Sequence, residues 1–285
     1  MRRNGSVLVA VLLLAALLTV FVGVAGERLR VASAATRNAA EDIAADVAVR
    51  SAVELLYART GGRFSDLSGV AGLAQTGLTV DVVARNEGTR VDLNAAAPEL
   101  LAGLLAVVGV DQRRAEYYAR VIVDRRREPG QPAERRRQVA VPAQGPFEHV
   151  RELDRLREIP TEVVRAIEPF VTVTSLDARV AVLTAPREVV AALPGMDPGR
   201  VEAFLADRVA WTGKFETLMR RYGIAQDHVS REGSSATRLT MAVRIGSHRI
   251  RGYEVVVATL PGDEEPYRFL AWNGNAPITG VAGSR

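Results

Sequence analysis

The chain has 285 residues, of which 48% are hydrophobic, and it contains no cysteine. Disulfides, thiolate metal sites and cysteine nucleophiles are therefore excluded. The 37 basic and 33 acidic residues leave a formal net charge of +4, and Lys214 is the only lysine. The length allows one large or two small domains, and the basic balance makes a nucleic-acid partner one hypothesis to weigh.

The first thirty residues contain an apolar run from Ser6 to Gly26 that no charge interrupts. About 20 apolar residues are needed for a helix that crosses roughly 30 Å of hydrocarbon. A removed secretory signal has a shorter core of about 7–15 apolar residues. The run therefore predicts a single transmembrane helix over 6–26, with Arg2 and Arg3 on the cytoplasmic side and the bulk of the chain outside. An uncleaved plain anchor and a removed signal peptide are the alternatives.

Residues 27–94 predict the outer half of the same helix, followed by the first strands of a sheet. There is no proline or glycine between Glu27 and Arg59, and Gly61-Gly62 supplies a stop. The unbroken helix would be roughly 80 Å long, and its alanine-rich outer half would lie on the sheet. Alternation over residues 78–94, "LTVDVVARNEGTRVDLN", predicts a β-hairpin that turns at residues 86–88.

Residues 95–225 predict a helical insertion with an internal repeat. The first copy is "VDLNAAAPELLAGLLAVVGVDQRRAEYYARVIVDRR" and the last is "VAVLTAPREVVAALPGMDPGRVEAFLADRVAW". In each copy a proline opens the first helix, a glycine ends it and an aspartate caps the second helix. These matched pairs are Pro98 and Pro186, Gly109 and Gly195, and Asp111 and Asp197. A degenerate middle copy, "FEHVRELDRLREIPTEVVRAIEPFVTVTS", has Thr161 as its expected cap.

The end of the chain returns to strands. Residues 236–285 contain stretches in which apolar and polar side chains alternate, which predicts strands. Turns are predicted at Gly246-Ser247 and at "GDEEP", and a last strand is predicted over 267–272. Gly233-Ser234-Ser235 is interpreted as a flexible linker before them. The predicted fold class is therefore α+β, with a long helix on an antiparallel sheet that a large helical insertion interrupts.

The leader and the repeat together resemble a known family. A short basic leader of residues 1–5 that ends in Gly5, directly before the apolar helix, is similar to the leaders of type IV pilins and pseudopilins. Most members have a glutamate at the fifth mature position, which here is Ala10. The order "VDLNAAAPELLAGL", "FEHVRELDRLREIP", "EPFVTVTS" and "TAPREVVAALPGMDP" resembles the K-type minor pseudopilin of type II secretion, a class that lacks that glutamate.

This resemblance implies a structural role rather than an enzymatic one. Prepilin peptidase would cut between Gly5 and Ser6, the new N-terminus would be methylated, and the helix would stay in the bacterial inner membrane as a single pass with the bulk of the chain in the periplasm. The subunit would bind other minor pseudopilins, initiate the pseudopilus and cap its tip. Small residues on the membrane helix would let partner helices pack closely. These are Ala10, Ala15, Ala16 and Gly23.

The alternative function is a membrane-anchored DNA receptor of the competence type, because copies one and three also resemble helix-hairpin-helix units. In DNA-binding hairpins a second glycine lets backbone N–H groups face a phosphate. Here Asp111 and Asp197 stand at that position, and a carboxylate repels phosphate. The arginine runs at 125–127 and 135–137 lie in a predicted solvated loop. We therefore expect no nucleic-acid partner.

A membrane-anchored enzyme is the third class of function to consider. The sequence contains no active-site motif that supports it. His149, His228 and His248 do not form a metal-binding pair by spacing, and no nucleophile elbow or phosphate-binding loop occurs. No cofactor is expected. The resemblance allows a calcium ion but assigns no ligands, and the acidic residues of "GDEEP" are interpreted as a hairpin tip.

Overall fold

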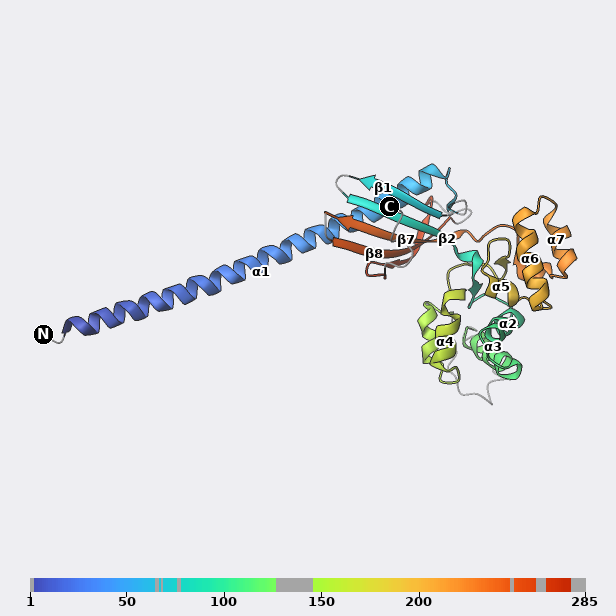
Figure 1. The fold of residues 1–285 in the computed structure, drawn as a ribbon, viewed down its shortest axis with the longest axis horizontal. Coiled ribbons are helices and arrows are strands. Elements are labelled where there is room, and N and C mark those ends of the chain that lie inside the picture. Colours follow the sequence, from blue (N-terminus) through green and yellow to red (C-terminus); the bar gives the residue numbers. More distant parts are fainter. Residues whose placement is uncertain are drawn as a thin grey trace.

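The structure is a computed structural model that describes residues 3–64, 67, 69–75, 78–126, 146–246, 249–259 and 265–277. Within these ranges only the backbone is described at residues 3–11, 16–17, 20, 22–35, 69–71 and 74–75. The molecule consists of a long helix, a sheet onto which the helix packs, and a helical head. Figure 1 shows the head beyond the sheet, at the end far from the N-terminus.

A five-stranded antiparallel sheet forms the centre of the molecule, in the order β1-β2-β7-β8-β9. This confirms the predicted mixture of helices with an antiparallel sheet. The head lies between β2 and β7, which are adjacent in the sheet although some 150 residues separate them in sequence. The strands are β1 (Gly69–Gln75), β2 (Leu78–Asn86), β7 (Ala236–Ile245), β8 (Arg249–Ala258) and β9 (Arg268–Asn273).

Helix α1 (Arg3–Arg59) packs its outer half onto one face of this sheet. The contact face repeats every three or four residues and consists mostly of alanine and valine, which let the helix lie close to the strands. Its buried residues are Ala45, Ala48, Val49, Ala52, Val53 and Leu56. They share a core with Val80, Val82, Leu239, Met241 and Val255 of the sheet.

Polar contacts along β8 fix where α1 lies on the sheet. Arg249 contacts Glu41 and Asp42 of α1, each at 2.9 Å. Further along the strand, the buried Tyr253 donates its hydroxyl to Asp46 Oδ1 at 2.6 Å. Because Tyr253 is fully buried, this carboxylate supplies the partner that its hydroxyl requires.

The N-terminal half of α1 continues without a break from Arg3. In the part of the chain that the structure describes, no helix contains an apolar stretch long enough to cross a membrane. The predicted span over 6–26 stays a prediction, since most of its side chains lie outside the description. The side chains of Gly5, Ser6, Ala10, Ala16 and Gly23 are among these, whereas Ala15 is exposed. Leu12, Leu13, Leu14, Leu18 and Phe21 are exposed as well.

The predicted hairpin over 78–94 is wrong. β2 ends at Asn86, the 3-10 helix η2 (Glu87–Thr89) follows, and β3 (Val91–Asp92) pairs with the head instead of returning along β2. The antiparallel neighbours of β2 are β1 and β7. Sequence alternation continued through residues 89–93, but it does not determine which strand is the partner.

The head contains two modules, each closed by a two-residue parallel strand pair. In the first module β3 pairs with β4, and in the second β5 pairs with β6. The first module comprises β3, α2 (Pro98–Val107), α3 (Gln112–Arg126), η4 (Val150–Arg155), α4 (Thr161–Ile167), η5 (Glu168–Phe170) and β4 (Val171–Thr172). The second comprises β5 (Val180–Ala181), α5 (Arg187–Ala191), α6 (Pro198–Ala210), α7 (Phe215–Tyr222), η6 (Gln226–His228) and β6 (Val229–Ser230).

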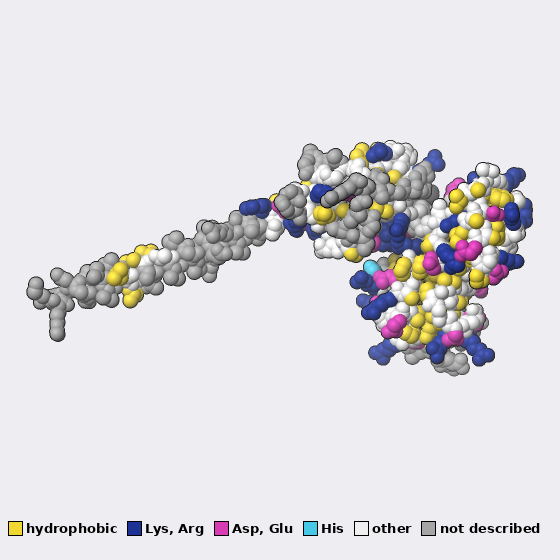
Figure 2. All heavy atoms as spheres, in the orientation of Figure 1, with side chains coloured by type: hydrophobic (Ala, Val, Ile, Leu, Met, Phe, Trp, Pro, Cys, Tyr) yellow, Lys and Arg dark blue, Asp and Glu magenta, His cyan; other side chains and the backbone are white. Residues whose placement is uncertain are grey.

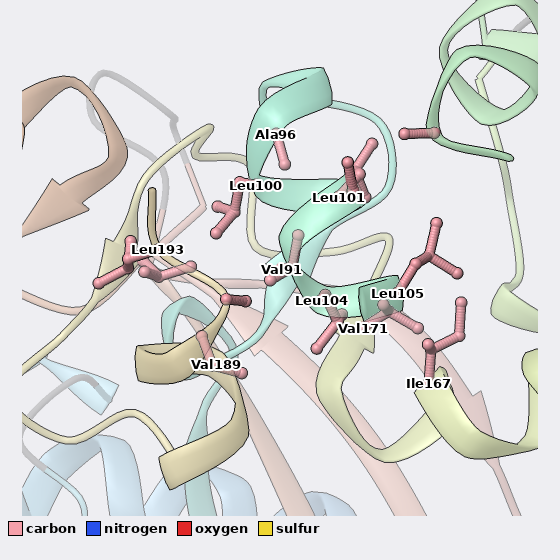
Figure 3. Packing of buried hydrophobic residues seen from close by; sticks show 14 of the residues in the cluster. Val91, Ala96, Leu100, Leu101, Leu104, Leu105, Ile167, Val171, Val189 and Leu193 are labelled. Carbon is pink, nitrogen blue, oxygen red and sulfur yellow. The ribbon is translucent and has the colours of Figure 1, made fainter. Parts of the chain in front are cut away.

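The two modules share one hydrophobic core. Figure 3 shows Leu100, Leu104 and Val91 of the first module beside Val189 and Leu193 of the second. Helices α2 and α5 approach so closely that a Cβ at Gly103 would lie 2.0 Å from the carbonyl oxygen of Ala192. Glycine is the one residue that permits this contact.

The repeated hairpins form as predicted. Gly109 and Gly195 have φ values of 97° and 80°, which favour glycine. Gly109 directly follows the C-cap of α2, as predicted, whereas α5 already ends at Ala191, so Gly195 lies in the turn between α5 and α6 instead of ending the helix. Asp111 Oδ1 accepts from the backbone N–H of Arg114 at 3.2 Å, and Asp197 Oδ1 accepts from that of Arg200 at 3.0 Å.

Two details of the predicted repeat are wrong. The N-cap of α5 is Pro186 itself, whereas Pro98 is the first helical residue of α2 after Ala97. The N-cap of α4 is Pro160 rather than Thr161, and it makes no side-chain capping bond. Pro160 and Pro186 have φ values of −60° and −63° with extended ψ values of 142° and 160°, so the fixed φ of proline suits the extended backbone that precedes each helix.

Candidate functional site

A network of hydrogen bonds and ion pairs connects the sheet to the head at the joint where the chain passes between them. The backbone leaves the sheet after Asn86 and returns to it at residue 236, so both crossings lie side by side. Asn86 Nδ2 donates to the carbonyl of Ser234 at 2.8 Å, and its Oδ1 accepts from Ser234 N–H at 2.8 Å and from Gly88 N–H at 2.9 Å. One amide side chain therefore ties the outgoing segment to the returning one.

Two glycines leave room for this crossing. A Cβ on Gly88 would lie 2.5 Å from the backbone nitrogen of Ser234, and one on Gly233 would lie 2.4 Å from the side chain of Asn86. Ser234 is itself buried, and its hydroxyl donates to the carbonyl of Ala236 at 3.1 Å. The interpretation of residues 233–235 as a flexible linker is therefore wrong, because these residues form the packed second half of the joint.

Glu87 lies at the centre of the joint and is completely buried. Its Oε1 accepts from Arg238 Nε of β7 at 2.7 Å, and its Oε2 accepts from Arg238 Nη2 at 3.1 Å. On the head side Oε2 also accepts from the hydroxyl of Thr172 and from that of Thr174 at 2.9 Å. The carboxylate thus connects the sheet directly to the closing strand of the first module.

Opposite charge holds this buried carboxylate in its ionised form. Burial alone would raise the pKa of Glu87, but the hydrogen bonds and charge of Arg238, then the charge of Arg90, outweigh burial and lower the pKa to about 2. Arg238 also pairs with Glu254 of β8. This second pair holds the guanidinium group on the sheet, where it faces the carboxylate of Glu87. The joint is therefore a rigid ionic connection rather than a solvated hinge.

A second buried carboxylate, Asp92, organises the loop that follows β4. Asp92 Oδ2 accepts from the backbone N–H and the hydroxyl of Ser175, each at 3.0 Å, and from the N–H of Leu176 at 3.2 Å. Its Oδ1 accepts from Asn94 N–H at 2.7 Å. These neutral donors do not offset burial, which raises the pKa of Asp92 above its ordinary value.

Arginines at equivalent places brace both modules. Arg126 donates to the carbonyls of Leu93 and Ala96 at 2.8 and 2.9 Å. Arg208 donates to those of Val182 and Ala185 at 3.0 and 2.7 Å. The four carbonyls occupy matching positions after β3 and β5. In both modules an arginine therefore donates hydrogen bonds to the backbone that leads into the first helix. The sequence alone does not reveal this role, because Arg126 belongs to a run typical of a solvated loop and Arg208 belongs to no motif.

The arginine runs do not form a described phosphate site. Arg125 is buried and contacts Glu152 at 2.9 Å, and Arg126 is occupied by the carbonyls named above. Residues 127 and 135–137 lie outside the described residues. Figure 2 shows basic and acidic side chains interspersed over the visible face of the head rather than gathered in one basic patch.

The residues considered for catalysis or metal binding have structural positions or lie outside the description. His149 caps η4, where its Nδ1 accepts from Arg151 N–H at 3.1 Å. His248, Asp263 and Glu264 lie outside the described residues. Among the described residues no three acidic, histidine or cysteine side chains group as metal ligands.

The comparisons with known proteins agree with this architecture. Residues 73–176, from β1 to the loop after β4, match the family model described as type II secretion system protein K. Over these residues the chain is similar to that family. The assignment to the minor pseudopilins of type II secretion, predicted from the sequence, is thereby confirmed.

A solved structure supports the fold of this chain over most of its length. A chain of the crystal structure of the GspK-GspI-GspJ complex from the enterotoxigenic Escherichia coli type 2 secretion system matches with a TM-score of 0.55 and 15% identity. The match covers 85% of this chain and 99% of that chain. At this identity the likeness establishes a shared fold. A comparison with curated proteins finds no match.

Proposed function

We propose that this protein is the tip subunit of the periplasmic pseudopilus, where it binds other minor pseudopilins, starts assembly and caps the fibre for protein export. The rigid joint is the observation that carries this proposal. A head fixed at the end of the sheet far from the N-terminus of α1 obstructs the addition of a further subunit above it (Figure 1).

The partners of the proposed tip complex follow from the similar solved structure. That structure is a complex of GspK with GspI and GspJ. The corresponding minor subunits of this protein's own secretion system are the proposed partners. No nucleic acid takes part, because the carboxylates of Asp111 and Asp197 occupy the hairpin turns that would face a phosphate.

The N-terminal segment supplies the proposed membrane attachment. Residues 6–26 would span the inner membrane after prepilin peptidase removes residues 1–5 between Gly5 and Ser6. Ala10, Ala15, Ala16 and Gly23 would allow close packing against partner helices. The role is structural, without catalysis or a cofactor, and the bulk of the chain lies in the periplasm.

Co-purification with each of the other pseudopilins tests the proposal. The full chain should form a stable complex with other minor pseudopilins and should be needed for fibres to start. Ala10→Glu should leave secretion nearly unchanged, because a tip subunit has no subunit ahead of it for the acid to contact. A chain that binds no pseudopilin would contradict the proposal.

A further inference from the structure

Arg90, which follows η2 at the start of the head, is a largely buried cation with unused hydrogen-bond donors. Its side chain is 16% exposed, and its contact with Glu87 Oε1 is an ion pair at 3.8 Å. The guanidinium donates no hydrogen bond to any residue that the structure describes. A guanidinium carries five N–H donors, and buried polar groups are nearly always hydrogen-bonded. Within the described chain, most of the binding capacity of Arg90 is therefore unused.

Glu87 does not fill this gap, because other donors already occupy its oxygens. Its Oε1 accepts from Arg238 Nε at 2.7 Å. Its Oε2 accepts from Arg238 Nη2 and from the hydroxyls of Thr172 and Thr174. Burial lowers the pKa of the Arg90 guanidinium below its ordinary value, and the charge of Glu87 does not offset this effect. The charge of Arg90 is therefore only partly compensated.

Two further arginines lie beside Arg90. Arg85 of β2 and Arg238 of β7 are directly opposite in the antiparallel register, so their side chains project from the same face of the sheet. Arg85 is exposed and has no ion pair with a described residue, and its charge also lowers the pKa of Arg90. Figure 2 shows basic side chains at the visible surface where the sheet meets the head. Like charges directly opposite each other destabilise a sheet, and an anion bound between them would remove this repulsion.

The balance of charge at the joint indicates which anion fits. The three arginines face two carboxylates, those of Glu87 and Glu254, so one positive charge is left over. A single carboxylate balances that charge, and its two oxygens match the planar fork of a guanidinium. A phosphate group with a charge near −2 would exceed the balance and would be repelled by the two glutamates.

We infer that Arg85, Arg90 and Arg238 form a binding site for one carboxylate at the joint between the sheet and the head. Arg90 would donate to both oxygens of the ligand, Arg85 would contact it from the exposed side, and Arg238 would contribute charge while it holds Glu87. Because Arg90 leads into the head and the other two arginines belong to the sheet, the bound carboxylate would connect the two parts a second time. The carboxylate is either an acidic side chain of another protein or a free small molecule.

Thermal unfolding of the full-length chain in mild detergent tests the site, with acetate as the probe. Replacement of chloride by acetate at constant ionic strength should raise the melting temperature by about 2–4 °C, as expected for a ligand that binds only the folded chain. Arg90→Gln should abolish the rise. Arg85→Gln changes an exposed residue that folding does not need, and it should also abolish or greatly reduce the rise.

The matched control is Arg244→Gln. Arg244 lies on the same face of β7 as Arg238 but already pairs with Asp81 at 3.3 Å, so this variant should keep the full response to acetate. An absent rise in the parent chain, or an equal rise in Arg90→Gln and Arg85→Gln, would overturn the site. A larger rise with inorganic phosphate than with acetate, lost in the same two variants, would overturn the assignment to a carboxylate.

A second measurement distinguishes the two sources of the carboxylate. Binding of another minor pseudopilin that is weakened both by acetate and by Arg90→Gln would assign the carboxylate to an acidic side chain of that partner. Binding that neither change affects, together with the acetate response, would assign the site to a free carboxylate. A parent chain that binds no pseudopilin would contradict the proposed function, whereas the acetate response of that chain would still support the site.

Discussion

Substitution of Glu87 by glutamine tests the ionic joint directly. The change keeps the size of the side chain but removes the charge that Arg238 contacts at 2.7 Å. Arg238 would then remain largely buried with Glu254 as its carboxylate partner. Removal of one partner from a buried ion pair costs about 3–5 kcal/mol where the other charge is left uncompensated, so this range is an upper bound for a variant in which Glu254 still contacts Arg238.

The pKa of Glu87 gives a second estimate of how much the ion pair stabilises the folded chain. A fall from the ordinary 4.5 to about 2 corresponds to about 3 kcal/mol of folding free energy at neutral pH. Because the folded-state pKa is the lower one, this stabilisation is present above pH 4.5 and is lost as the pH falls towards 2. The glutamine variant cannot ionise, so its stability should depend less on pH in this window.

The two tryptophans provide separate probes for this experiment. Trp211 lies in the head against its core, and Trp272 lies in β9 of the sheet. Urea unfolding followed by fluorescence of the Trp211→Phe and Trp272→Phe backgrounds reports each part of the molecule. We expect Glu87→Gln to lower the free energy of unfolding by about 3 kcal/mol at pH 7. The two parts should then unfold at different urea concentrations, because the connection between them is weakened.

Glu254→Gln is the matched control, since Glu254 contacts the same arginine from a more exposed position. It should cost less than about 1 kcal/mol. A Glu87→Gln chain that unfolds at the parental urea midpoint, with the parental dependence on pH between 5 and 3, would refute the ionic joint.

Three further predictions concern other parts of the chain. Gly103→Ala should destabilise the head by about 1–3 kcal/mol or more in urea unfolding, because the added methyl group meets the carbonyl of Ala192; unchanged stability would contradict the close helix contact. Mass spectrometry of membrane-extracted protein should find methylated Ser6 as the first residue, and a bulky replacement of Gly5 should leave the leader attached. Mobility-shift assays should show no DNA binding tighter than about 10⁻⁴–10⁻⁶ M at physiological salt, whereas tight binding lost on removal of residues 135–137 would support the DNA receptor.

Local patterns predicted the regular elements because their signals lie within a few residues. Gly61-Gly62 follows the end of α1, and Gly246 turns β7 into β8 with a φ of 60°. Over residues 237–241 the side chains of β7 alternate between buried and half-buried, in agreement with the sequence pattern. Such elements need only their own sequence to be identified.

The missed elements either have little strand preference of their own or depend on partners that are distant in the sequence. β1 has the sequence "GVAGLAQ", whose glycines and alanines have little strand preference, and it forms because β2 offers an edge to pair with. The parallel pairs of β3 with β4 and β5 with β6 are two residues long, which is too short for any periodicity.

The joint was hidden for the same reason. Asn86, Glu87 and Gly88 have the composition of an exposed turn. Their buried role depends on Arg238, which lies 151 residues from Glu87 in sequence. One signal of the head's internal contacts was present in the sequence. Arg126 and Arg208 each lie near the end of the second helix of their repeat, and this shared position could have indicated a shared role.

Immunogold labelling of assembled pseudopili tests the proposed tip position most directly. The head presents a large surface for antibody binding. Fibres are elongated by an excess of the major subunit and labelled with an antibody against the head, so that the label shows where the protein lies. The account predicts label at one end of each fibre and no fibres in its absence. Label distributed evenly along the fibres, or normal fibres without the protein, would contradict it.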